Sequence, residues 1–133
     1  MKKVLVDTSL FISWFRGQHI DLAQKVLTCV PYLSSVVATE LKAGARTTKQ
    51  QRQLDKMLSA YEDTDRIITP DHQTYREAGT VIAKLGVPTK SILADTLIAL
   101  SARSIGAEVW TINESDFKKV QGVRQYKLNV IRK

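Results

Sequence analysis

Asp7 is the first residue in the chain whose setting suggests chemistry. It directly follows the apolar run Val4–Val6 and precedes two hydroxyl residues, Thr8 and Ser9. This pattern predicts a short buried strand that ends at a carboxylate and continues into a helix. Ligands of open α/β sheets bind beyond the carboxyl ends of the strands, where we expect Asp7 to lie.

Asp95 is the second acidic residue in an unusual setting, because the helix predicted around it is the most apolar of the chain. Its neighbours three and four positions away include Ile92, Ile98 and Ala99. The spacing predicts that its carboxylate points to the buried side. A buried carboxylate is unfavourable unless it is hydrogen-bonded, paired or bound to metal. The alternative is an ordinary acid near the helix start, favoured by the helix dipole and bonded to Ser91.

Two further acids are candidates for the same site. Asp116 follows a predicted strand over 108–112, although it could equally be a capping acid before Phe117. Glu40 lies in a predicted helix over 36–43, where most glutamates are simply solvated. We expect both to converge on Asp7.

Four carboxylates in one pocket need a cation. Two carboxylates ~4 Å apart repel by about 4 kcal/mol at an effective dielectric constant of ~20. Mg²⁺ or Mn²⁺ reverses this repulsion, because hard cations prefer oxygen ligands. Such an ion can activate water and neutralise charge on a phosphate. The acids therefore indicate metal-dependent phosphodiester hydrolysis.

The composition fits a nucleic-acid partner. The chain has 20 Lys and Arg against 13 Asp and Glu, a net charge of +7. A basic body suits a polyanion, although basic charge can also serve solubility alone. Cys29 is the only cysteine, and His19 and His72 are isolated, so no disulfide framework or zinc site is predicted. No signal peptide or membrane span is evident, and we expect one cytoplasmic domain.

Strands and helices should alternate along the chain, an order that favours parallel pairing. Strands are predicted over about 3–6, 32–35, 66–69, 108–112 and 127–131. Helices are predicted over about 10–16, 21–30, 36–43, 50–61, 71–85, 92–105 and 113–119. Thr8 or Ser9 is expected to cap the first helix, and Asp71 the fifth, whose buried stripe is predicted to comprise Tyr75, Ala78, Ile82 and Leu85.

Four segments of this sequence resemble the PIN domain, and most closely the VapC-type toxins of toxin–antitoxin pairs. They are Val4–Ser9, Val37–Leu41, Leu93–Ala99 and Thr111–Phe117. The resemblance implies a single PIN domain over residues 1–133. It further implies a three-layer α/β/α sandwich around a central, mostly parallel sheet of four to five strands.

The resemblance also implies roles for individual residues. Asp7, Glu40, Asp95 and Asp116 match the acidic quartet that binds Mg²⁺ or Mn²⁺ in such enzymes. Thr8, Thr111 and Asn113 match polar positions that orient ligands or phosphate. Members of this family are ribonucleases that cut specific RNAs such as tRNA or rRNA, commonly dimerise and are inhibited by a cognate antitoxin. A cytoplasmic homodimer or larger toxin–antitoxin assembly is therefore expected.

Our hypothesis is in-line hydrolysis of RNA by a metal-activated water, with Asp7 and Asp95 as direct ligands. Basic residues expected to contact phosphate are Arg16, Lys42, Arg46, Lys49 and Lys90. An antitoxin helix is expected in a groove between the first helix and the helix over 50–61, unless those side chains are ordinary core. The groove residues would be Phe11, Trp14, Phe15, Leu54, Met57, Leu58 and Tyr61.

Two alternatives remain open at this point. A phosphotransfer domain could use Asp7 as nucleophile, but dehalogenase-type phosphatases have a second aspartate two residues on, where this chain has Ser9. A catalytically silent PIN-like module could bind RNA or protein without cleavage. The intact set of acids argues against that second alternative.

Overall fold

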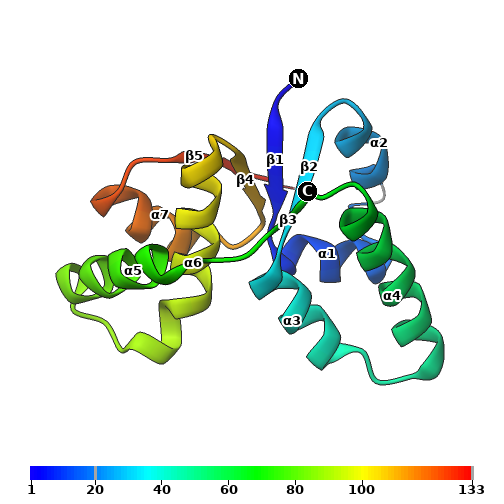
Figure 1. The fold of residues 1–133 in the computed structure, drawn as a ribbon, viewed down its shortest axis with the longest axis horizontal. Coiled ribbons are helices and arrows are strands. Elements are labelled where there is room, and N and C mark those ends of the chain that lie inside the picture. Colours follow the sequence, from blue (N-terminus) through cyan, green and yellow to red (C-terminus); the bar gives the residue numbers. More distant parts are fainter. Residues whose placement is uncertain (20, 133) are drawn as a thin grey trace.

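A five-stranded parallel sheet forms the centre of the molecule. The computed structural model describes residues 1–19 and 21–132. The strand order is β3-β2-β1-β4-β5, and every neighbouring pair is parallel. Helices flank the sheet, with α5, α6 and α7 on one side of the molecule and α1 to α4 on the other (Figure 1). This arrangement confirms the predicted α/β fold with a parallel sheet.

Strands and helices alternate nearly throughout, as expected for parallel connections. The strands are β1 (Lys3–Val6), β2 (Val30–Ser34), β3 (Ile67–Ile68), β4 (Glu108–Thr111) and β5 (Lys127–Val130). The helices are α1 (Thr8–Phe15), α2 (Leu22–Leu27), α3 (Ser35–Gly44), α4 (Thr48–Asp63), α5 (His72–Leu85), α6 (Thr89–Ile105) and α7 (Glu114–Val123). Among the described residues, no helix combines the length and apolar character that a membrane crossing requires.

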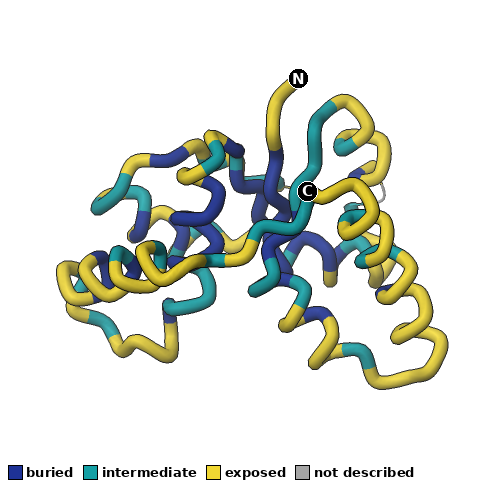
Figure 2. The backbone as a smooth tube through the Cα atoms, in the orientation of Figure 1, coloured by how far each residue is buried: buried dark blue, intermediate teal, exposed yellow. Residues whose placement is uncertain are grey.

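β1 is the central strand, and it is buried on both faces. Val4, Leu5 and Val6 are 0%, 0% and 1% exposed. Figure 2 shows the same burial running through the middle of the molecule, while the outer faces of α4 and α5 are exposed. Burial on both faces explains why this strand reads as a continuous apolar run and not as an alternating pattern.

The direction in which strands are added changes beside β1. From β1 the chain moves outward to β2 and β3, then returns to place β4 on the other side of β1. The carboxyl ends of β1 and β4 are therefore neighbours at the topological switch point. In open parallel sheets this is the place where ligands bind.

The largest differences from the predicted boundaries concern the helix before β2, α6 and α7. The helix predicted over 21–30 ends at Leu27, and Val30 begins β2. A residue before proline is biased toward extended backbone, so Pro31 favours the strand at Val30. α6 begins at Thr89, after Pro88 as the N-cap residue, and α7 continues to Val123 because Val120 extends its buried face.

In α5 the predicted N-cap residue, Asp71, is confirmed, but the predicted set of buried residues is partly wrong. The Asp71 side chain accepts a hydrogen bond from the Thr74 backbone N–H at 2.8 Å. Tyr75, predicted as buried, is 51% exposed, and the fully buried positions are Ala78 and Val81. A tyrosine tolerates such a place because its hydroxyl end is compatible with water.

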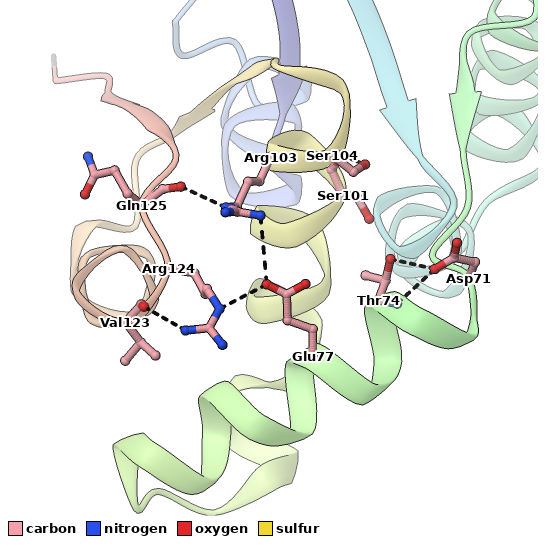
Figure 3. Close-up of polar contacts among 9 residues, drawn as sticks. All are labelled: Asp71, Thr74, Glu77, Ser101, Arg103, Ser104, Val123, Arg124 and Gln125. Carbon is pink, nitrogen blue, oxygen red and sulfur yellow. Dashed lines mark hydrogen bonds and ion pairs between the residues drawn. The ribbon is translucent and has the colours of Figure 1, made fainter.

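A charged brace joins α5, α6 and α7, as Figure 3 shows. Glu77 Oε1 accepts a hydrogen bond from Arg124 Nε at 3.1 Å and lies 4.0 Å from a terminal nitrogen of Arg103. Arg103 Nε in turn donates to the Gln125 carbonyl at 3.1 Å. The brace fixes the C-terminal end of α7, whose first turn carries Asp116.

Candidate metal-binding and active site

Asp7 lies where β1 gives way to α1, at the switch point of the sheet. Its backbone N–H donates to the Trp110 carbonyl at 2.8 Å, and its carbonyl accepts from the Leu10 N–H at 3.1 Å. Asp7 is thus the N-cap residue of α1, and the predicted cap by Thr8 or Ser9 is wrong. Its side chain makes no capping bond, so the carboxylate is available for other contacts.

One oxygen of the Asp7 carboxylate, Oδ2, accepts two side-chain hydrogen bonds. Ser9 Oγ donates to Asp7 Oδ2 at 2.6 Å, and Thr111 Oγ1 donates to the same oxygen at 2.8 Å. Thr111 Oγ1 also accepts the backbone N–H of Asn113 at 2.9 Å. Asp7 Oδ1 accepts no hydrogen bond from the described residues, so this oxygen is available to a cation.

Glu40 is tied to the start of α1. It is exposed, and its Oε1 accepts a hydrogen bond of 2.7 Å from Thr8 Oγ1. This contact joins α3 to α1 across 32 residues of sequence. Glu40 is therefore fixed in position and is not a freely solvated glutamate.

Asp95 lies in the second turn of α6 and shares the electrostatic field of the other three acids. The alternative bond from Ser91 does not form, because the Ser91 hydroxyl donates to the Pro88 carbonyl at 2.7 Å. Burial raises the pKa of Asp95 to about 7, together with the negative charges of Asp7, Asp116 and Glu40 and a hydrogen bond with the Asp116 side chain. The carboxylates are thus close enough to oppose one another's ionisation.

Asp116 lies in the first turn of α7. One oxygen of its carboxylate is 3.8 Å from Lys119 Nζ. This lysine neutralises part of the negative charge on the side of the site formed by α7. Asp116 is therefore both a neighbour of Asp95 and one half of a partly exposed ion pair.

The four acids form one electrostatic cluster but not a closed cage. Within residues 1–19 and 21–132, no three acidic, histidine or cysteine side chains lie close enough together to enclose one ion. The donor set is nonetheless all oxygen and carries excess negative charge, which fits a hard divalent cation. Closing such a shell requires side-chain rotation, or water molecules between the carboxylates and the ion.

Two residues near this cluster escaped prediction. Ser9 contacts Asp7 directly. This contact could have been predicted, because Ser9 is only two residues beyond Asp7 in the sequence. Tyr126 is 5% exposed and donates to the Phe117 carbonyl at 2.6 Å. Burial first, and then the charges of Asp95 and Asp7, raise the pKa of Tyr126. No sequence pattern marks Tyr126, because its neighbourhood depends on the docking of α7.

The basic residues predicted to contact RNA are all exposed, but they are not equivalent. Lys42 Nζ forms an ion pair of 2.8 Å with Asp55, which joins α3 to α4. Arg16, Arg46, Lys49 and Lys90 form no ion pair with the described residues. Lys90 lies in the first turn of α6, while Arg16 and Lys49 lie beside a groove.

This α1–α4 groove is a hollow of about 580 Å³ between α1, α3 and α4. Its lining includes Ile12, Phe15, Arg16, Glu40, Lys49 and Leu54. Of the side chains predicted to form an antitoxin groove, Phe15 and Leu54 line this hollow. Phe11 is 3% exposed and belongs to the core, so its place in the predicted groove is wrong. Trp14, Met57, Leu58 and Tyr61 pack against the core without lining the hollow.

Comparisons with known proteins agree with this fold. The PIN domain family model matches residues 4–123. A search of curated proteins found no match. Chains of similar fold occur in VapBC complexes, and the likeness extends over almost the full length in each case.

Three of these complexes illustrate the likeness. The chain from VapBC2 of Rickettsia felis, bound to a promoter DNA fragment, has a TM-score of 0.70 at 21% identity, covering 98% of this chain and 99% of that one. The chain from DNA-bound VapBC of Salmonella typhimurium has a TM-score of 0.71 at 22% identity, covering 98% of both chains. The chain from VapBC-5 of Mycobacterium tuberculosis, a member of a family of toxin–antitoxin systems, has a TM-score of 0.62 at 21% identity and covers 100% of both.

The family model covers most of the sequence, and Asp7 lies at the switch point of a parallel sheet. This chain therefore belongs to the PIN domain family, and its fold is that of chains found in VapBC toxin–antitoxin complexes.

Proposed function

We propose that this protein, one PIN domain over residues 1–133, is a metal-dependent endoribonuclease and the toxin of a type II toxin–antitoxin pair. The observation that carries the proposal is the place of Asp7 at the switch point of the sheet, where Ser9 and Thr111 hold its carboxylate. The charges of Asp7, Asp116 and Glu40 all act on Asp95 beside it. Carboxylates brought together in this way at a sheet switch point suit a cation and a phosphodiester substrate. Structured RNA such as tRNA or rRNA is the proposed substrate.

Mg²⁺ or Mn²⁺ is the proposed cofactor. Asp7 and Asp95 would hold it directly, and Glu40 and Asp116 would complete its surroundings directly or through water. A bound divalent cation supplies Lewis acidity, which lowers the pKa of water and offsets charge on the phosphate. Ser9 and Thr111 would keep the free oxygen of Asp7 directed at the cation.

The remaining polar residues have positioning roles in this proposal. Thr8 holds Glu40 through its hydroxyl, and Asn113 steadies Thr111 through its backbone N–H. Arg16, Arg46, Lys49 and Lys90 are proposed to attract the RNA backbone, and Lys42 would contribute beside Asp55. These charges provide sequence-independent affinity, so cleavage should weaken as salt increases.

A cognate antitoxin is the proposed inhibitor, since chains of this fold occur in the VapBC complexes. The assembly proposed is a homodimer or a larger toxin–antitoxin complex in the cytoplasm. The docking of an antitoxin helix across α1 and α4 stays a prediction. Hydrogen exchange measured with and without the antitoxin would test it, and unchanged exchange at both helices would argue against that site.

The proposed function can be tested directly on purified protein. Total tRNA and rRNA are incubated with Mn²⁺, with Mg²⁺ or with EDTA, and the fragment ends are mapped. We expect discrete cuts that need the divalent cation and disappear in Asp7→Asn, while Mn²⁺ raises the melting temperature of the wild type only.

Asp63→Asn is the matched control, because Asp63 is exposed at the end of α4 and distant from the cluster in sequence. It should cut like the wild type. If Asp7→Asn cut at the wild-type rate, or if neither cation stabilised or activated the wild type, the nuclease proposal would be wrong. The second result would favour a non-catalytic PIN-like module.

A further inference from the structure

The α1–α4 groove has a feature that the metal cluster does not explain, an exposed aromatic ring beside it. Phe15 is 52% exposed. Its ring lies 6.3 Å from that of Phe11 and 5.4 Å from that of Trp14, measured between centroids. The rings of Phe11 and Trp14 thus pack near Phe15 within α1, while part of the Phe15 ring stays exposed. Ile12, 37% exposed, lines the same groove, and contiguous exposed apolar side chains can mark an interaction site.

The groove is continuous with the acidic cluster. Glu40 lines it, and the same residue is bonded to Thr8 and acts electrostatically on Asp95. Because Glu40 is shared by the groove and the cluster, a chain molecule whose phosphate lies at the acids can extend into the groove. The hollow of about 580 Å³ is large enough for a small segment of such a molecule.

The charge at the groove favours a polyanion. Arg16 and Lys49 line it, both are exposed, and neither forms an ion pair with the described residues. Proteins that bind single-stranded nucleic acid combine such cations with aromatic rings on which bases stack. Paired bases inside a duplex cannot offer a free face to a ring on a helix.

We propose that the α1–α4 groove binds an unpaired nucleotide next to the scissile phosphate, with its base stacked on Phe15 and its backbone held by Arg16 and Lys49. The inference rests on the proposed nuclease function and adds to it a nucleotide-binding subsite centred on Phe15. An antitoxin segment is the competing occupant of this groove.

The binding test uses a fluorescein-labelled single-stranded RNA octamer in EDTA at low salt, where metal-dependent cleavage cannot occur. We expect the octamer to bind and to quench the fluorescence of Trp14, which adjoins Phe15. Phe15→Leu should weaken binding about tenfold, in line with loss of one base–aromatic stack. Phe15→Tyr should restore binding, and Lys49→Ala should weaken it independently of the aromatic ring.

Tyr75→Leu is the matched control, since Tyr75 is another half-exposed aromatic residue, on α5. It should bind the octamer like the wild type, and the same sequence as a duplex should bind more weakly. Equal affinity of Phe15→Leu and the wild type would overturn the nucleotide site and leave the groove to a protein segment. Equal affinity for duplex and single strand would also overturn it.

A parallel arm adds Mn²⁺ and follows cleavage of the octamer by the wild type. Cleavage with unchanged binding by Phe15→Leu would refute this inference alone. Loss of binding in Phe15→Leu, with no cleavage by the wild type of the octamer or of total tRNA and rRNA, would refute the nuclease function and retain the groove as an RNA-binding site.

Discussion

Thr111 holds Asp7 across the junction of two neighbouring strands, through a hydrogen bond of 2.8 Å from Thr111 Oγ1 to Asp7 Oδ2. Thr111 is fully buried, and it ends β4, whereas Asp7 follows β1. The backbone N–H of Asp7 is bonded to the Trp110 carbonyl next to it. Strand pairing and the side-chain bond together set the direction of the carboxylate.

Replacement of Thr111 by valine should show how much this hydrogen bond contributes to metal affinity. Valine keeps the shape of the side chain but cannot donate to Asp7. We expect Mn²⁺ affinity, measured by isothermal titration calorimetry, to fall about tenfold, as when a metal ligand loses its supporting hydrogen bond. The metal-free protein should lose only about 1 kcal/mol of stability.

Thr111→Ser should retain most of the affinity. Thr96→Val is the control, since Thr96 is equally buried but donates to the Ile92 carbonyl within α6. Unchanged Mn²⁺ affinity in Thr111→Val would show that the hydroxyl does not orient Asp7.

The raised pKa of Asp95 predicts how the stability of the metal-free protein depends on pH. The pKa is about 7 in the folded chain and about 4 in an unfolded one. Because the folded value is higher, the stabilising contribution is complete below about pH 4 and is lost as the pH rises through about 7. Asp95→Asn should therefore be more stable than the wild type at pH 8, by a difference that is smaller at pH 5 and disappears below about pH 4.

Denaturant unfolding in EDTA at the two pH values measures this difference. The same gap between Asp95→Asn and the wild type at pH 5 and pH 8 would contradict the coupling of the acids.

Lys49 should contribute to RNA affinity through charge alone. Lys49→Ala should weaken RNA binding similarly for all sequences and reduce the slope of log affinity against log salt by about 1. Lys127→Ala is the control, because Lys127 is exposed at the opposite, amino-terminal edge of the sheet. Filter binding at several salt concentrations would measure both slopes, and equal slopes would exclude a phosphate contact by Lys49.

The charged brace formed by Glu77, Arg103 and Arg124 should contribute more to the stability of the fold than to catalysis. Glu77→Gln removes the charge that faces Arg103 and Arg124, both partly exposed. We expect a loss of about 1 kcal/mol at low salt and less at high salt. Thermal unfolding would measure it, with the exposed Glu62→Gln on α4 as control. A salt-independent loss would mean that packing, not charge, connects α5 to α7.

Local sequence patterns predicted the parts of the site that depend on single elements. The apolar run before Asp7 predicted β1 and its end, because a central parallel strand is buried on both faces. Helical spacing predicted that Asp95 points inward, since its neighbours on that face are apolar. The partly buried position and raised pKa of Asp95 follow from that spacing.

The parts that depend on distant segments could not be predicted in this way. Tyr126 reaches the cluster only because α7 docks beside β5, and no periodicity marks that contact. Phe11 and Phe15 look alike in sequence, yet one is core and the other is exposed, since α3 and α4 cover only part of α1. Pro31 suggested the end of a helix, whereas its effect on Val30 favoured the strand.

The bond from Thr111 to Asp7 spans 104 residues of sequence. A fragment that stops short of Glu108 keeps three of the four carboxylates but lacks the strand that completes the pairing of β1. Such long-range pairing is slow to form, because the intervening loop must close first. During synthesis the acidic centre can therefore be completed only after this last part of the chain has been made.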